Sequence, residues 1–272
     1  NGQIVGFTGR IFEPIPTSES GGASYAKATE GQAKYINTPQ TLIYDKSRVL
    51  YGLDKSKLAV RQADNCLLVE GNMEVIAAAQ AGVKNTVAVS GTALTSDQVN
   101  ILKRYTGNVK MLFDMDKAGE EATKKSVKLG FGQDMNVEVV ELPEGKDAAD
   151  LARKNPELLK AAIEKASGAI EYFLKKVLTR HEKESEEGKK KIADEMLDMI
   201  LNLASEIGKG HWIKRLSEEL DIKEIVLTDM LKKVILKNKT ASDSRKENQE
   251  TEKFYPINKL DTLIRDLTGL ML

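Results

Sequence analysis

The stretch VKMLFDMDKAGEEATKKSVKLGF, residues 109–131, contains an apolar run and a charged segment that meet at two carboxylates. The run that ends at Phe113 shows no strict alternation of apolar and polar residues, which is typical of a strand covered on both faces. The segment from Lys117 onward has a helical pattern. Asp114 and Asp116 lie between the two patterns. The stretch therefore predicts a buried β-strand that ends at a pair of acids and is followed by a helix.

Three further runs rich in valine, leucine and isoleucine flank this stretch. They are CLLVEG at 66–71, TVAVSG at 86–91 and NVEVVEL at 136–142, and helical patterns separate the strands at 72–82, 95–107 and 117–131. Thr95 or Ser96 is suited to cap the second helix, while Gly82 and Gly107 are suited to the position after a helix. Strands that alternate with helices over short connections predict a parallel α/β sheet with right-handed crossovers.

Acidic residues follow three of the four predicted strands, at the edge where open parallel sheets bind ligands. They are Glu70, Asp114, Asp116, Asp147 and Asp150. Carboxylates gathered at one edge repel one another unless protons or a cation neutralise them, and a divalent metal ion does so directly. The helix dipole also favours acids at a helix start, so the pair Asp114 and Asp116 by itself leaves a solvated helix end open as an alternative.

The composition restricts the kind of metal site. Lys and Arg together number 41, as do Asp and Glu, so any basic surface must come from segregation of charge. Cys66 is the only cysteine, which excludes an internal disulfide and a cysteine-based zinc site within this chain. Because His181 and His211 lie outside the motifs, oxygen ligands and therefore Mg²⁺ or Mn²⁺ are expected. The sequence contains no signal peptide and no apolar run of roughly 20 residues, so no membrane partner is expected.

The sequence outside residues 65–142 has two different characters. Residues 1–60 are irregular, with short strand-like pieces and a polar stretch of small residues, whereas residues 151–238 have apolar positions at helical spacing. The chain begins with Asn1 in mid-pattern and ends within an apolar periodic stretch, so we expect a fragment of a longer protein.

Several motifs, taken in their order along the chain, resemble the family of bacterial replicative DNA primases. The resemblance to the Toprim domain of these enzymes lies in LLVEGNMEVIAAAQAGVKNTVAVSGTALT (67–95), VKMLFDMDKAGEEA (109–122) and ELPEGKDAADL (141–151). The resemblance to the basic amino-terminal half of their RNA polymerase core lies in GFTGRIF (6–12), KYINTPQT (34–41) and DKSRVLYGL (45–53). The resemblance covers nearly the whole chain and is strong through residue 150.

The resemblance implies an α/β fold with a Toprim-type parallel sheet flanked by helices. Part of a small mixed α+β subdomain would precede the sheet, and a helical subdomain would follow it. The implied boundaries are 1–62 for the partial basic subdomain, 63–152 for the Toprim metal-binding domain, 153–238 for the helical subdomain, 239–256 for a linker and 257–272 for the truncated start of a helicase-interaction domain. Zinc is expected only in an upstream domain that this chain lacks.

The same motifs imply roles for the acids. Glu70 matches the Toprim glutamate, which acts in acid–base chemistry or in metal organisation, and Asp114 and Asp116 match the Asp-x-Asp metal ligands. Asp147 matches the first acid of a later Asp-Pro-Asp motif, whose second acid falls on Ala149. Further departures from the family pattern are Asn72 for Tyr, Glu74 for Asp and Met115 for Gly. Ala149 removes one expected carboxylate, and the sequence leaves open whether the neighbouring Asp150 replaces it.

The function that the resemblance implies is primer synthesis by a DNA-directed RNA polymerase. One or two Mg²⁺ or Mn²⁺ ions would support nucleotidyl transfer from ribonucleoside triphosphates on a single-stranded DNA template. The residues that match template and nucleotide contacts are Arg10, Lys34, Asn37, Lys46 and Arg48. Implied partners are the replicative helicase, through 257–272, and single-stranded DNA-binding protein, in the cytoplasm of a bacterium.

Two other functions fit the same acids. A Toprim-family nuclease or DNA-cleaving enzyme would share them, but topoisomerase cleavage needs a nucleophilic tyrosine, and nothing marks Tyr105, Tyr172 or Tyr255 for that role. Ala149 gives some weight to a third reading, a non-catalytic Toprim nucleic-acid-binding protein. Synthesis of short RNA separates the primase from both alternatives.

Overall fold

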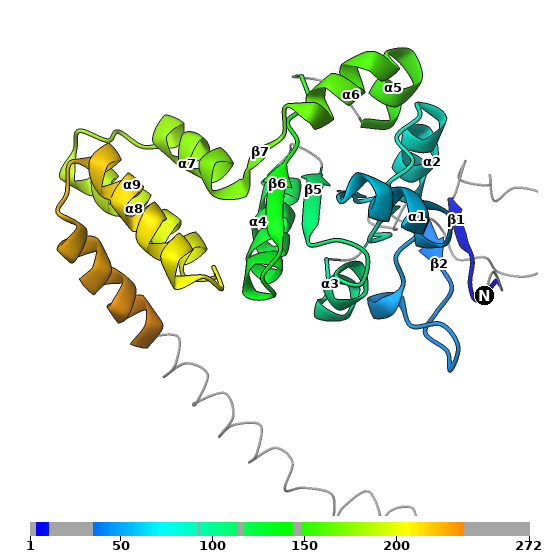
Figure 1. Ribbon diagram of the computed structural model, residues 1–272, viewed down its shortest axis with the longest axis horizontal. Helices are drawn as coiled ribbons and strands as arrows, with labels where there is room; N and C mark the ends of the chain where they lie inside the picture. Colours follow the sequence, from blue (N-terminus) through cyan, green and yellow to red (C-terminus); the bar gives the residue numbers. More distant parts are fainter. Residues whose placement is uncertain (1–3, 11–34, 92, 114–116, 144–147, 237–272) are drawn as a thin grey trace, which may run out of the picture. The chain divides into compact units, whose positions relative to one another are not determined.

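The structure, a computed structural model, describes residues 4–10, 35–91, 93–113, 117–143 and 148–236. The chain forms two compact units, Asn1–Ala169 and Ile170–Leu272. A mostly parallel sheet with helices lies in the first unit, and the described part of the second unit is helical (Figure 1). The predicted α/β fold class, with a helical part after the sheet, is therefore confirmed.

A five-stranded sheet forms the centre of the first unit, in the order β4-β3-β5-β6-β7. The strands are β3 Cys66–Val69, β4 Thr86–Ala88, β5 Asn108–Leu112, β6 Asn136–Val139 and β7 Ser167–Gly168. The first four are parallel, as predicted, and β7 is antiparallel to β6. The short strand β7 lies in a stretch predicted to be helical, because two residues are too few to show a strand period.

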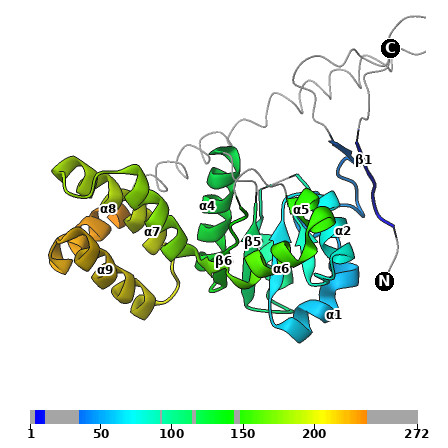
Figure 2. The same ribbon diagram turned by 90° about the horizontal axis from the view of Figure 1, so that it is seen from above.

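Both faces of the sheet are covered, which explains the continuous apolar runs. Leu67 and Val69 pack into a core with residues of α2, α5 and α6. Because side chains alternate along a strand, Cys66 and Leu68 face the other way, and both are fully buried as well. These helices are α2 Asn72–Gln80, α5 Ala148–Lys154 and α6 Pro156–Glu164, and α2 lies beside α5 (Figures 1 and 2).

The remaining helices of the sheet region are α3 Ser96–Leu102 and α4 Lys117–Gly132. Thr95 caps α3, and its Oγ1 accepts the backbone N–H of Gln98 at 3.1 Å, so the predicted cap is confirmed. Gly82 follows α2 with φ +90°, the left-handed conformation expected after a helix. The prediction for Gly107 is wrong, because α3 ends at Leu102 and the chain then turns into β5.

The amino-terminal part contains a two-stranded antiparallel ribbon of β1 Thr8–Arg10 and β2 Tyr35–Asn37. It is followed by a 3₁₀ turn, η1 Lys46–Arg48, and by helix α1 Leu53–Ala63. The sequence did not predict α1. Only Ser56 and Val60 of this helix are buried, and the helix is polar on average although its few apolar residues share a helical period.

The second unit contains α7 Ala169–Arg180, α8 Glu186–Ile200 and α9 Glu206–Leu220, and residues 224–236 are also helical. Ser185 and Ser205 cap α8 and α9 through their hydroxyl oxygens. Fully buried side chains from several helices form the core, including Ile192, Met196, Leu197, Ile200, Leu216 and Leu220. Among the described residues, no helix combines the length and apolarity that a membrane span requires.

Cys66 should not react with thiol reagents in the folded protein. Its side chain is fully buried at the start of β3, and burial raises the pKa of the thiol to about 12. Because the thiolate is the reactive form, we expect no labelling at pH 8 and complete labelling after denaturation. Mass spectrometry of the labelled protein measures both. Rapid labelling under native conditions would show that β3 opens locally.

Candidate functional site

The carboxyl edge of the sheet begins where Glu70 leaves β3. The strand register pairs Val69 with Ala88 of β4 on one side and with Leu112 of β5 on the other. Three parallel strands therefore end at the same level. Glu70 is half-buried, and its backbone carbonyl accepts the N–H of Ser90 at 3.0 Å, so the loop after β4 contacts the backbone of Glu70 directly.

The side chain of Glu74 holds the backbone N–H of Glu70. Its Oε2 accepts the backbone N–H of Glu70 at 3.1 Å and that of Gly71 at 3.2 Å, so Glu74 supplies the N3 half of a capping box at the start of α2. A carboxylate in this role satisfies N–H groups that the helix start leaves unpaired. Glu74, a departure from the family pattern, thus stabilises the turn that carries Glu70.

The loop after β4 adopts an unusual backbone conformation. Ser90 has φ +60° and Gly91 has φ +72°, in the left-handed region that non-glycine residues rarely adopt. The Ser90 hydroxyl donates to Asn72 Oδ1 at 2.5 Å, and Gly91 donates its N–H to the Glu70 carbonyl at 3.3 Å. These contacts tie the loop to the start of α2. Asn72, a second departure from the family pattern, accepts one of these hydrogen bonds.

The 3₁₀ turn Lys46–Arg48, here called the basic turn, lies toward the same edge of the sheet. Tyr51 pairs with Ala88 of β4 in an antiparallel bridge, with N···O distances of 2.9 and 3.0 Å. In such a bridge the residues before Tyr51 run past the carboxyl end of β4. Lys46 is half-buried and Arg48 is exposed, so the predicted contact residues of the basic turn and Glu70 belong to one edge.

Asp45 holds the basic turn from its amino-terminal side. Its Oδ1 accepts the Ser47 hydroxyl at 2.6 Å and the Ser47 backbone N–H at 2.9 Å. These two hydrogen bonds lower the pKa of the Asp45 carboxyl below its ordinary value. The carboxylate therefore stays ionised at neutral pH, and the contribution of this cap to stability is lost only as the pH falls through the lowered pKa.

Two other predicted contact residues lie on the ribbon of β1 and β2. The register places Asn37 opposite Thr8 and Arg10 opposite Tyr35. The predicted contact residue Lys34 lies outside the described residues.

The predicted metal ligands Asp114, Asp116 and Asp147 also lie outside the described residues. Phe113, which precedes Asp114 in the sequence, is buried just past the end of β5. Within the described ranges, no three His, Cys, Asp or Glu side chains form a group suited to a metal ion. Convergence of the acids therefore stays a prediction that follows from the parallel topology.

Asp150 lies in the first turn of α5, where its own helix supplies cations. Lys154 donates to the Asp150 carboxylate at 3.2 Å and Arg153 donates to it at 2.5 Å. The hydrogen bond and charge of Lys154 are the main causes that lower the pKa of the Asp150 carboxyl, and Arg153 adds to them. The side chains of Asp150 and of both cations are exposed, so these weak ion pairs do not decide whether Asp150 replaces the acid missing at Ala149, and that role stays a prediction.

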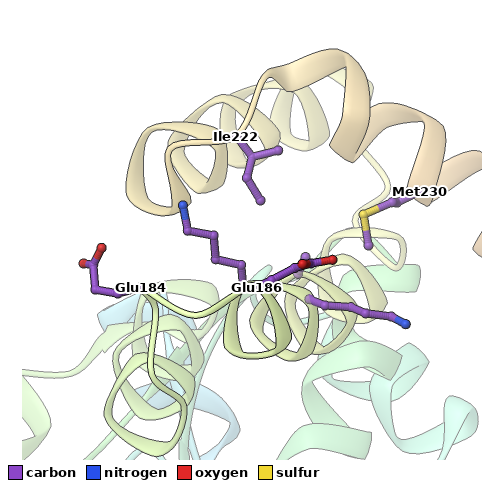
Figure 3. A pocket seen from close by; sticks show the side chains of 7 residues that line it. Glu184, Glu186, Ile222 and Met230 are labelled. Carbon is purple, nitrogen blue, oxygen red and sulfur yellow. The ribbon is translucent and has the colours of Figure 1, made fainter.

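Two cavities lie outside this edge. One of about 230 Å³ opens at the amino-terminal ends of β3, β5 and β6, where Asp64, Asn65 and Asn108 are among its lining residues. The other, of about 520 Å³, lies in the second unit, with Ile222 and Met230 among apolar lining residues and Glu184 and Glu186 at the start of α8 (Figure 3). Neither contains a residue that the sequence singled out for catalysis.

The chain matches two protein families in sequence. Residues 1–57 match the family described as the DNA primase catalytic core, N-terminal domain, and residues 67–152 match the family described as Toprim-like. A DNA primase from Clostridium acetobutylicum is 31% identical over 241 residues, which cover 87% of this chain and 37% of that protein. The chain spans about a quarter to a third of the length of the curated DNA primases that it matches.

Solved structures of DNA primases share the fold. The crystal structure of a DNA primase domain from Pseudomonas aeruginosa superimposes with a TM-score of 0.70 at 27% identity, covering 85% of this chain and 68% of that one. A DnaG primase catalytic domain bound to single-stranded DNA gives a TM-score of 0.67 at 25% identity, with 82% and 67% coverage. The similarity therefore extends over both the sheet region and the helices beyond it.

Proposed function

We propose that this chain belongs to the family of DNA primase catalytic cores and is the part of a DNA primase that joins ribonucleotides into short RNA on single-stranded DNA. The observation that carries the proposal is the carboxyl edge of the sheet. There the Toprim glutamate Glu70 and the basic turn lie at the same edge, reached from two different segments of the chain. An acidic edge beside phosphate-binding cations suits transfer of a nucleotidyl group.

The proposed metal ligands are Asp114, Asp116 and Asp147, with Glu70 as a ligand or as the residue that organises the ligands. All four are carboxylates, the hard oxygen donors that suit Mg²⁺ or Mn²⁺. A bound divalent ion supplies activation of the attacking 3′-hydroxyl and neutralisation of triphosphate charge. Glu70 would hold or accept a proton at this edge. Its backbone N–H is held by Glu74 and its carbonyl by Ser90, which would keep the Glu70 side chain in place for that role.

The proposed contacts with template and nucleotide are Arg10, Lys34, Asn37, Lys46 and Arg48. Lys and Arg bind phosphate without reading bases, which suits an enzyme that starts at many sites. The related domain bound to single-stranded DNA supports that ligand for this chain. We further propose the boundaries 1–62, 63–152, 153–238, 239–256 and 257–272, a bacterial cytoplasmic location, and helicase contact through 257–272.

Primer synthesis tests the proposed function. The protein that carries this chain is incubated with single-stranded DNA, the four ribonucleoside triphosphates and Mg²⁺, and products are resolved on a denaturing gel. We expect short RNA chains that disappear when the metal is chelated. Cleaved DNA without RNA would instead support a Toprim nuclease, and binding without either product would support a non-catalytic nucleic-acid-binding protein.

A further inference from the structure

The N-terminal end of α3 binds the basic turn through its capping residues. Gln98 Nε2 donates to the backbone carbonyl of Val49 at 2.8 Å and to that of Lys46 at 3.4 Å. Thr95 Oγ1 donates to the carbonyl of Ser47 at 2.5 Å. Three carbonyls in and next to the basic turn are therefore held by two side chains that lie about 50 positions further along the chain.

Gln98 is well suited to this task and Glu would not be. Its side chain is fully buried, and its Oε1 accepts the backbone N–H of Thr95 at 3.1 Å, which closes the capping box of α3. Glu serves equally well in a capping box. However, only the amide also has N–H groups to donate, and both hydrogen bonds to the basic turn need a donor. The choice of Gln thus matches the contact with the basic turn rather than the helix cap alone.

These contacts leave the charged ends of the basic turn available. Its carbonyls point toward α3, while the side chain of Arg48 is 65% exposed and, among the described residues, forms only a long ion pair of 4.0 Å with the exposed Asp97. An exposed ion pair of this kind contributes little to stability. Arg48 can therefore exchange Asp97 for a phosphate, whereas the backbone beneath it is fixed by buried hydrogen bonds.

We propose that Gln98 is a positioning residue that holds the basic turn at the carboxyl edge of the sheet, so that Lys46 and Arg48 face the nucleic-acid backbone beside Glu70. This inference rests on the proposed function for its consequence, but the contact itself stands on the hydrogen bonds. Gln98 joins a segment of the amino-terminal family match to a helix of the Toprim-like match. It would thereby set the distance between phosphate contacts and acids.

Gln98→Glu, assayed at a pH at which the introduced carboxyl is ionised, tests the proposal, because the carboxylate keeps an acceptor for Thr95 and removes both donors to the basic turn. Local opening should accelerate tryptic cleavage after Lys46 and Arg48 by at least about tenfold, as measured by mass spectrometry. Affinity for a single-stranded oligonucleotide should fall at least about fivefold, and the slope of log affinity against log salt should flatten by about one. Loss of stability alone would not change that slope.

In a variant that already carries Lys46→Ala and Arg48→Ala, Gln98→Glu should cause no further loss of affinity.

Thr106→Val is the matched control. Thr106 is buried as well, and its hydroxyl bonds Asp64 at 2.9 Å and accepts the N–H of Asn108 at 3.0 Å at the opposite edge of the sheet. It should change neither cleavage nor binding. Unchanged cleavage or unchanged salt dependence in folded Gln98→Glu would overturn the proposal, as would equal losses in the control. Absence of primers from the wild-type protein would refute the proposed function alone, because cleavage of the basic turn needs no activity.

Discussion

Asp114→Asn is expected to lower primer synthesis by at least about 100-fold while binding of single-stranded DNA stays within a few-fold. Asn has nearly the shape of Asp but lacks its charge, so the change removes electrostatic support for a divalent ion worth several kcal/mol, at 1.36 kcal/mol per tenfold in rate. The proposed contacts with template and nucleotide are four cations and Asn37, which lie elsewhere on the chain and are not altered. Gel assays of RNA products across a Mg²⁺ titration, with fluorescence anisotropy for binding, measure the two effects separately.

Asp134→Asn provides the control for this prediction. Asp134 is exposed, has φ +55°, and lies just before β6 at the amino-terminal edge of the sheet. Asn accepts this left-handed conformation as readily as Asp, so the same chemical change should leave synthesis and folding unaltered. If Asp114→Asn retained full synthesis under these conditions, the assignment of Asp114 as a metal ligand would be wrong.

The sheet could be predicted because its signal is local and repeated. Each parallel strand is buried on both faces, so runs such as 66–71 and 86–91 are apolar throughout, and their length separates them from the helices between them. Parallel topology then assigns Glu70 to one edge without any knowledge of contacts. Helix α1 was not predicted, because its sequence signal is weak. Its apolar residues do share a helical period, but the helix is polar on average and buries only Ser56 and Val60, so its signal is weaker than that of the strands.

The organisation of the site could be predicted only in part. Thr95 was one of two residues predicted to cap α3, and in the structure it forms a capping box there with Gln98. The second use of this box, in which Gln98 binds the basic turn, depends on the path of residues 45–51 along β4 and leaves no local trace in the sequence. The same holds for the end of α3. In the sequence, the helical pattern continues through Tyr105. In the structure, the Thr106 hydroxyl donates to Asp64, and the helix stops before Gly107.

Glu70→Gln is expected to lower primer synthesis by about 100-fold or more, within the range that general acid–base groups contribute. The backbone of residue 70 should not move, because its N–H is held by Glu74 and its carbonyl by the loop at Ser90. The substitution therefore tests the carboxylate alone. Rates of RNA synthesis measured across pH would show the loss, together with disappearance of any acidic limb that Glu70 causes.

Glu74→Gln separates this role from that of the neighbouring acid. The amide oxygen of Gln can accept the same N–H groups of Glu70 and Gly71, as in many capping boxes, so synthesis should stay within about threefold. Glu74→Ala removes the acceptor and should cost about 1 kcal/mol of stability, measurable by urea unfolding. A loss of synthesis in Glu74→Gln as large as that in Glu70→Gln would mean that Glu74 carries charge-dependent chemistry. The capping role would then be an incomplete account of this departure from the family pattern.

Full activity in Glu70→Gln would remove Glu70 from the reaction and leave it as a turn residue.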